Sequence, residues 1–274
     1  MSIAKVGDIN LYYEVHGKGE PLVLIMGYRA SNVGWFLIQD KLAREYRVIL
    51  FDNRGTGQSG KPEIPYTIKM MAADVAGLLD VLDISAASVF GHSMGGMIAQ
   101  EFALNYPDRL NTLILGGTTC GGSRAVPPTA EAIAFLFDPE LAKLPVADRI
   151  RAMIPWLWNK EFMDNNQAAI ERYITLASEY PTPPQTAVSQ QNAIMTHDTY
   201  DRLPDIKSPT LIIAGSKDRL VPSENSKLLA SRIPNAEVAI IENAGHEYFD
   251  DSADKASKII LDFLRGHSKS RANN

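Results

Sequence analysis

The sequence predicts an α/β fold, in which a mostly parallel, doubly wound sheet carries a helical insertion. Short apolar runs recur along the chain, segments with helical spacing separate them, and the alternation stops between residues 115 and 209. Apolar runs of this length are typical of buried parallel strands, and their alternation with helices is typical of a doubly wound sheet. The 274 residues suffice for one core domain of this class.

The first expected element is a hairpin. The stretch "AKVGDINLYYEV" alternates between apolar and polar residues on either side of a Gly-Asp turn. This period of two predicts an antiparallel hairpin added at the edge of the sheet.

Six apolar runs follow the hairpin and are expected to be buried parallel strands. They cover residues 22–26, 47–51, 87–90, 110–115, 209–214 and 237–241. Apolar residues recur at helical spacing over 67–83 and 252–264, which predicts amphipathic helices there.

The interval from 121 to 200 is rich in helix formers and aromatic residues and predicts a helical insertion, with proline clusters at 126–128 and 181–184 that end or stiffen its helices. We therefore divide the chain into a core of residues 1–120 and 201–266, the insertion 121–200, and a polar, flexible tail 267–274. Several large side chains of the insertion could line a pocket or form its own core: Phe135, Phe137, Met153, Trp156 and Trp158.

Composition narrows the classes of partner. Hydrophobic residues make up 45% of the chain and the net charge is −5, so neither disorder nor a nucleic-acid partner is expected. The single cysteine, Cys120, excludes an internal disulfide or a CxxC metal site, and nothing near it completes a catalytic thiol. The N-terminus lacks an apolar export signal, and no run reaches the ~18 apolar residues of a membrane span. A cytoplasmic location without membrane attachment is expected.

The segment "VFGHSMGGMIAQ" carries the clearest chemical signal. Gly91, Ser93 and Gly95 form a G-x-S-x-G pentad between an expected strand and an expected helix. In this context the pentad predicts a sharp strand-to-helix turn that exposes a nucleophilic serine. The small glycines allow strand and helix to approach each other around the strained serine.

A serine nucleophile needs a histidine base and a carboxylate that orients it. Among five histidines, His246 in "NAGHEYFDD" is favoured, because this polar loop follows the last strand at the carboxyl edge of the sheet. His92 is adjacent to Ser93, but neighbours at a strand end point in different directions, so packing or a supporting hydrogen bond is its expected role.

Two aspartates compete for the carboxylate role. Asp218 in "GSKDRLVP" and Asp52 in "DNRGTGQSG" each follow an apolar run. This constellation on an α/β sheet runs in the order serine, acid, histidine, which favours Asp218.

Together, "DNRGTGQS", "GHSMG", "GSKDRLVP" and "NAGHEYFDD" resemble the α/β-hydrolase superfamily over essentially the whole chain. The resemblance implies that the insertion is a cap, that a substrate pocket lies between cap and sheet, and that the backbone N–H groups of Tyr28 and Met94 form an oxyanion hole. Many relatives carry His-Gly-x-Pro where this chain has "MGYR". Arg29 then faces either solvent or the pocket, where it would meet a substrate carboxylate.

The "MG" loop, the following "SNVGW" and the compact cap are most similar to 3-oxoadipate enol-lactonases and to methyl esterases of the aclacinomycin type. We therefore expect hydrolysis of a small carboxylic ester or lactone through an acyl-enzyme, without a metal or an organic cofactor. Met153, Trp156, Trp158 and Arg29 are the candidate pocket residues. A carbon-carbon bond hydrolase with the same triad and a non-catalytic ligand receptor remain the alternatives.

Overall fold

The computed structural model describes residues 2–136 and 138–268. Phe137, which we considered for a pocket or core, and residues 269–274 of the predicted tail lie outside these residues.

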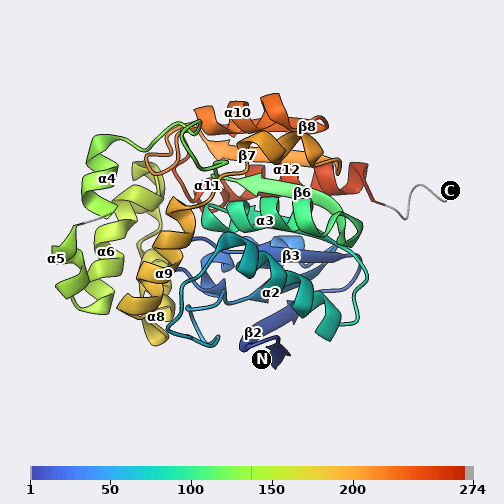
Figure 1. The fold of residues 1–274 in the computed structure, drawn as a ribbon. Helices are drawn as coiled ribbons and strands as arrows, with labels where there is room; N and C mark the ends of the chain where they lie inside the picture. The colour runs from blue at the N-terminus through green and yellow to red at the C-terminus, as the bar shows by residue number, and fades with distance from the viewer. Residues whose placement is uncertain (1, 137, 269–274) are drawn as a thin grey trace.

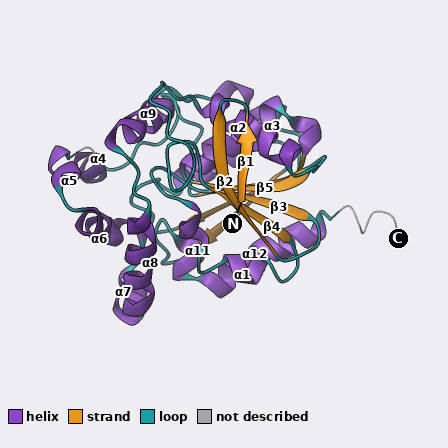
Figure 2. Cartoon of the chain, turned by 90° about the horizontal axis from the view of Figure 1, so that it is seen from below, coloured by secondary structure: helices purple, strands orange, loops and turns teal. Residues whose placement is uncertain are grey.

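One eight-stranded sheet forms the centre of the described chain (Figures 1 and 2). Its strands follow the spatial order β1-β2-β4-β3-β5-β6-β7-β8. They are β1 (Ser2–Val6), β2 (Ile9–His16), β3 (Pro21–Ile25), β4 (Arg47–Phe51), β5 (Ala87–His92), β6 (Leu110–Gly116), β7 (Thr210–Gly215) and β8 (Ala236–Ile241).

Strand direction follows the prediction. The hairpin β1–β2 and the β2–β4 pair are antiparallel, with Tyr13 opposite Phe51, and the remaining pairs are parallel, with Leu24 beside Phe90. The chain runs from β3 to β4 on one side and returns to add β5 on the other side of β3. This reversal makes the carboxyl ends of β3 and β5 the topological switch point of the sheet, where α/β proteins bind their ligands.

Helices cover both faces of the sheet, and each face has its own apolar core. One face carries α2 (Ile68–Val81), α3 (Met94–Asn105) and α10 (Glu224–Arg232), and the other carries α1 (Gln39–Leu42), α11 (Tyr248–Asp251) and α12 (Ala253–Gly266). In α2, Thr67 caps the first turn by accepting the Met70 N–H at 3.0 Å, and Met71, Val75 and Leu78 present one buried stripe. Complete burial of such a side chain contributes about 1.5–3 kcal/mol.

The interval between β6 and β7 is helical and stands beside the end of the sheet, on the left of Figure 1. It contains α4 (Ala130–Leu136), α5 (Pro139–Lys143), α6 (Val146–Leu157), α7 (Lys160–Asn165), α8 (Gln167–Glu179) and α9 (Pro184–Met195). Short 3₁₀ helices cover Asn32–Trp35, Pro107–Arg109 and Tyr200–Asp205. An isolated antiparallel bridge between Gly121 and Asp198 joins the two ends of this interval. The exact boundaries at residues 120 and 200 stay a prediction.

The prediction that all six parallel strands are buried is wrong for β8. Val238 is 43% exposed and Glu237 is also exposed, because β8 is the edge strand and pairs only with β7. An apolar run in the sequence does not distinguish an edge strand from a central one.

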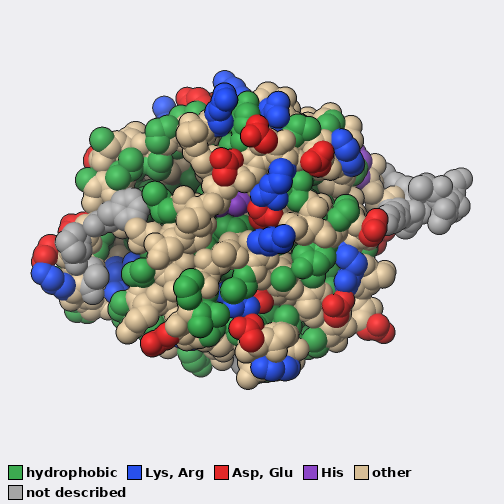
Figure 3. Space-filling model, in the orientation of Figure 1, with side chains coloured by type: hydrophobic (Ala, Val, Ile, Leu, Met, Phe, Trp, Pro, Cys, Tyr) green, Lys and Arg blue, Asp and Glu red, His purple; other side chains and the backbone are tan. Residues whose placement is uncertain are grey.

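Among the helices of residues 2–136 and 138–268, none is both long and apolar enough to cross a bilayer. Acidic and basic side chains are interspersed over the face shown in Figure 3.

A substitution at Gly91 tests how closely β5 packs against α3. A Cβ at Gly91 would lie 2.1 Å from the Gly95 carbonyl oxygen, which is backbone and cannot rotate away. We expect Gly91→Ala to lower the free energy of unfolding by roughly 3 kcal/mol, measured by urea denaturation. Gly266→Ala is the control, because a Cβ there meets no atom within 4 Å. Equal stability of the two variants would contradict the packing argument.

Candidate active site

Ser93 lies in the turn between β5 and α3 and has φ 57° and ψ −122°. A side chain at this positive φ is strained by about 1–3 kcal/mol, and such strain persists only where surrounding contacts impose it. Two such contacts hold the Ser93 backbone: its N–H donates to the Gly116 carbonyl at 2.8 Å, and Thr118 Oγ1 donates to its carbonyl at 2.7 Å.

The loop after β3 passes directly beside Ser93. A Cβ built on Gly27 would stand 2.9 Å from Ser93 Cβ and 3.4 Å from Ser93 Oγ. Only a residue without a side chain leaves the hydroxyl in place. Gly27 therefore bounds one side of Ser93 at the carboxyl ends of β3 and β5.

His246 and Asp218 form a buried pair. His246 Nδ1 lies 2.6 Å from Asp218 Oδ2. The other oxygen, Asp218 Oδ1, accepts the backbone N–H groups of Leu220 at 2.9 Å and Val221 at 2.8 Å. Because a carboxylate only accepts, Nδ1 carries the proton and Nε2 is left with a free lone pair.

The end of β6 brings the serine and this pair to one place. Ser93 is hydrogen-bonded to Gly116, and a Cβ on the next residue, Gly117, would lie 3.4 Å from both Asp218 Oδ2 and His246 Cε1. Gly117 has φ 46°, a conformation that suits glycine. Ser93 and the His246–Asp218 pair, which are more than a hundred residues apart in sequence, therefore converge around Gly116 and Gly117.

The pKa of His246 reflects two opposing effects. Burial alone would lower it, but the charge of Asp218 and the hydrogen bond to it, with a contribution from Glu247, raise it above the ordinary 6.5. The folded state therefore holds the imidazolium more tightly than the unfolded chain does. The stability from this pair is fully present below pH 6.5 and is lost as pH rises through the raised pKa.

His92 does not share this arrangement. Its ring is buried among Trp35, Tyr248 and Phe249 and lies 4.5 Å from the His246 ring, centroid to centroid. Neither of its ring nitrogens lies within hydrogen-bond distance of a partner among the described residues, but Nε2 lies 3.6 Å from Glu247 Oε2. Burial lowers the pKa of His92, and the charge of Glu247 opposes this shift. His92 therefore packs behind His246, with the buried carboxylate of Glu247 beside it.

Asp52, the rival carboxylate, serves its own loop. Its two oxygens accept the backbone N–H groups of Asn32 and Gln58, each at 2.7 Å. The structure therefore brings Asp218, and not Asp52, to His246.

His246 lies in the loop between β8 and α11, after the last strand as the sequence predicted. His246 and Glu247 are buried, and the chain continues into α11, where Tyr248 and Phe249 are fully buried. The polar pattern did not indicate this burial, which follows from the packing of the two aromatic residues in the core on that face of the sheet.

A family model described as the alpha/beta hydrolase fold matches residues 20–253. The chain belongs to the α/β-hydrolase family.

Known relatives of this α/β-hydrolase agree on hydrolysis but differ in the bond they cleave. The RutD protein of Azorhizobium caulinodans, whose name describes a carbamate hydrolase, is 34% identical over 96% of this chain and 98% of its own. A 2-hydroxy-6-oxononadienedioate/2-hydroxy-6-oxononatrienedioate hydrolase of Paraburkholderia xenovorans is 31% identical over 94% and 91%. The structure of the enol-lactonase from Burkholderia xenovorans superposes with a TM-score of 0.84 at 25% identity, covering 96% of this chain and all of that one. The protein is a hydrolase.

The two predicted oxyanion residues of this α/β-hydrolase flank the serine. Met94 is the first residue of α3, so its N–H has no acceptor within the helix. Tyr28 follows Gly27, the residue that touches Ser93.

Arg29 has φ 61° and is clamped by the helical insertion, since its N–H donates to Gln190 Oε1 at 3.0 Å and its carbonyl accepts from Thr182 Oγ1 at 2.9 Å. Its half-buried guanidinium lies over the Tyr28 ring, with Cζ 5.8 Å from the centroid. Gln190 and Thr182 were not predicted, because no local pattern indicates that they contact a loop more than 150 residues away.

The other candidate pocket residues belong to an apolar cluster of the insertion that also contacts the core, through Arg219, Leu220 and Asp250. Trp156 stacks on Phe135 at 4.8 Å and lies under the Arg219 guanidinium at 4.0 Å. Trp158 and Met153 belong to the same apolar cluster. Of the two interpretations that the sequence left open, these contacts support an insertion core.

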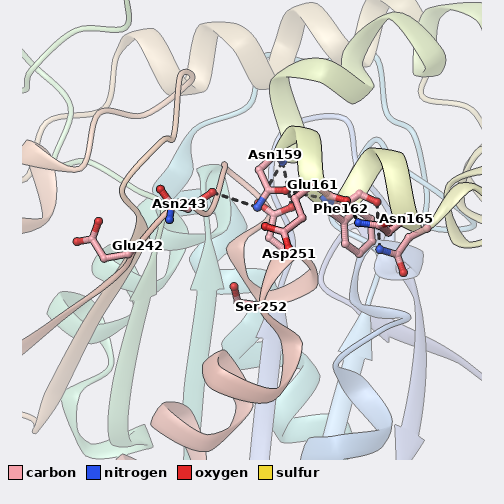
Figure 4. A pocket seen from close by; sticks show the side chains of 9 residues that line it. Asn159, Glu161, Phe162, Asn165, Glu242, Asn243, Asp251 and Ser252 are labelled. Atoms are coloured by element: carbon pink, nitrogen blue, oxygen red, sulfur yellow. Dashed lines mark hydrogen bonds between the residues drawn. The ribbon is translucent and has the colours of Figure 1, made fainter.

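A cavity of about 430 Å³ opens between α7 and the His246 segment (Figure 4). Its wall is made mainly of amide and carboxylate side chains, including Asn159, Asn243 and Asp251. This cavity was not predicted from the sequence, although the acidic pair that ends "NAGHEYFDD" includes Asp251, one of the residues that line it.

The pKa of His246 can be measured by NMR titration of its imidazole. We expect a value above 6.5 in the native protein, because Asp218 outweighs burial. In Asp218→Asn the opposing charge is gone and burial dominates, so the value should fall below 6.5. His267, the residue that follows α12, serves as an internal reference within the same spectra, since its Nδ1 is bonded to the Phe263 carbonyl rather than to Asp218. A lower native value, or no change in Asp218→Asn, would show that the pair is not coupled.

Proposed function

We propose that the protein is a serine hydrolase that cleaves small carboxylic esters or lactones through an acyl-enzyme intermediate. The observation that carries this proposal is the convergence of Ser93, in its strained turn, with the buried His246–Asp218 pair at the end of β6. A nucleophile, a base with a free Nε2 and a fixed carboxylate are the parts that acyl transfer needs.

In the proposed first step, His246 Nε2 takes the Ser93 hydroxyl proton as Ser93 Oγ attacks the carbonyl carbon. The negative charge that develops on the carbonyl oxygen is held by the N–H groups of Tyr28 and Met94. Collapse of this intermediate breaks the bond to the alkoxy oxygen, which receives the proton from His246, and leaves the acyl group on Ser93.

In the second step, His246 removes a proton from a water molecule, which attacks the acyl-serine carbonyl. The carboxylic acid leaves, and Ser93 regains its proton. In a lactone the alcohol and the acid stay in one molecule, so the product is a hydroxy acid or, from an enol-lactone, its keto form. Asp218 stays ionised throughout and stabilises the imidazolium.

Similarity to relatives supports an acyl substrate and suggests which substrates to compare. Superposition on an enol-lactonase supports a lactone, and similarity to RutD adds carbamates, whose carbonyl is open to the same attack. Similarity to the Paraburkholderia enzyme favours carbon-carbon bond cleavage as the second candidate. A panel of enol-lactone, aryl ester, carbamate and dienoate substrates separates these reactions by their relative kcat/KM.

Ser93→Ala tests the nucleophile. We expect wild-type turnover of short-chain p-nitrophenyl esters and a loss of about 10⁴-fold or more in kcat in the variant, because the acyl-enzyme can no longer form. The exposed helix residue Ser231 provides the control, and Ser231→Ala should retain activity. A fluorophosphonate should label Ser93 alone.

Hydrolysis that survives Ser93→Ala, or labelling at another serine, would contradict the proposal. Labelling of Ser93 with negligible turnover and tight binding of a small ligand would instead favour a receptor on this fold.

Gly27→Ala tests whether the close approach of the loop after β3 to Ser93 is needed for activity. The added methyl would contact Ser93 Cβ at 2.9 Å and push the nucleophile from its place. Because a misplacement of about 1 Å can cost 10²-fold in rate, we expect kcat for p-nitrophenyl esters to fall about 10²-fold. Gly266→Ala, which has open space for the methyl, should leave kcat unchanged. Full activity in Gly27→Ala would place the reacting hydroxyl elsewhere.

A further inference from the structure

The segment Leu157–Asn159, which we call the strap, joins α6 to α7 and lies against the chain beside His246. The Leu157 carbonyl accepts the backbone N–H of Glu247, the residue after His246, at 2.9 Å. The strap belongs to the helical insertion, so one side of the histidine segment is bonded directly to that insertion.

The carboxylate of Asp251 connects the residue before His246 to the strap. Asp251 Oδ2 accepts the backbone N–H of Gly245, the residue before His246, and Asp251 Oδ1 accepts the backbone N–H of Asn159 at 3.0 Å. Both chain neighbours of His246 are therefore connected to the strap, one directly and the other through Asp251.

Further contacts fix the position of the strap relative to the segment that holds His246. A Cβ on Gly245 would lie 2.7 Å from the Leu157 carbonyl oxygen and 3.3 Å from the Trp158 carbonyl carbon. Trp158 Nε1 donates to Asp250 Oδ2 at 3.1 Å in the buried interior. In Figure 4, dashed lines join Asn159 to Asn243, whose carbonyl accepts the Asn159 side-chain N–H at 3.0 Å.

We propose that Asp251 is a positioning residue for His246, and that through it the strap of the insertion sets the place of the imidazole over Ser93. This inference rests on the proposed function, in which His246 is the base. Asp218 orients the ring about Nδ1, but it does not hold the backbone from which the ring projects. That backbone is held by the strap and Asp251, and such supporting hydrogen bonds determine how accurately a catalytic group is placed.

Asp251→Asn tests the proposal with little change of shape. Both Asp251 oxygens accept the Asn159 N–H, Oδ1 at 3.0 Å and Oδ2 at 3.3 Å, whereas the Gly245 N–H is bonded to Oδ2 alone. An amide offers one acceptor oxygen instead of two, so either the Gly245 N–H loses its partner or the Asn159 N–H keeps only its longer contact. We expect kcat for p-nitrophenyl esters to fall about 10- to 100-fold with KM within about threefold, because the base is misplaced while substrate contacts stay. The downfield NMR resonance of the His246 Nδ1 proton should shift or broaden.

Two further variants control the test. Glu242→Gln removes the same charge from an exposed residue on the wall of the same cavity, and should match the wild type in kcat and in the resonance. Asp251→Glu retains both acceptor oxygens and should recover part of the lost kcat. If Asp251→Asn does not fold, Trp158→Phe takes its place. It removes the N–H donated to Asp250 and part of the ring that packs on Phe162 and Tyr173, and it should show the same pattern more weakly.

The proposal is overturned if Asp251→Asn keeps wild-type kcat and an unchanged His246 resonance, if only KM changes, or if Glu242→Gln loses as much activity. Failure of the proposed function is a different result. In that case Ser93→Ala leaves hydrolysis intact, while the resonance of the His246 Nδ1 proton still reports whether Asp251 holds the loop.

Discussion

The close crossing of backbones at the carboxyl ends of β3 and β5 is the constraint on which the rest of this structure depends. A Cβ on Gly95 would lie 2.1 Å from the Ile25 carbonyl oxygen, and one on Gly91 equally close to the Gly95 carbonyl. Because these positions carry no side chain, α3 can start directly against β3 and hold Ser93 at φ 57°. The strain there is offset by hydrogen bonds from neighbouring strands, above all from Ser93 to Gly116.

Burial then determines the electrostatics around His246. Three acidic residues follow it in the chain, and burial raises the pKa of Asp250 far above its usual range and that of Asp251 to about 6, with the charge of Glu247 adding to both shifts. The Asp218 carboxylate accepts two backbone N–H groups and faces Nδ1 of the imidazole. A site rich in carboxyl groups thus keeps one of them suited to orienting the base.

Local sequence patterns correctly predicted those helices and strands whose position along the chain follows from the spacing of their own apolar residues. The antiparallel hairpin, the strand 47–51 and the helices near 67–83 and 252–264 appear where the periodicity placed them. The exposed edge of β8 and the buried segment after His246 did not follow from the pattern, because burial depends on which neighbours the fold supplies. The same reason left Trp156 and Trp158 undecided until Phe135, Phe162 and Arg219 were placed beside them.

The sequence by itself determined the family, the strand-to-helix turn at Ser93 and the order serine, acid, histidine along the chain. These follow from glycine spacing and from short motifs that act through their own backbone. The chain order already favoured Asp218 over Asp52 and a supporting role for His92. Only the tertiary structure shows Asp218 bonded to His246, the ring of His92 beside that of His246, and Asp251 joining the histidine segment to the insertion. Those partners are separated by 28 residues or more in sequence, and contacts over such separations exist only once the chain has folded.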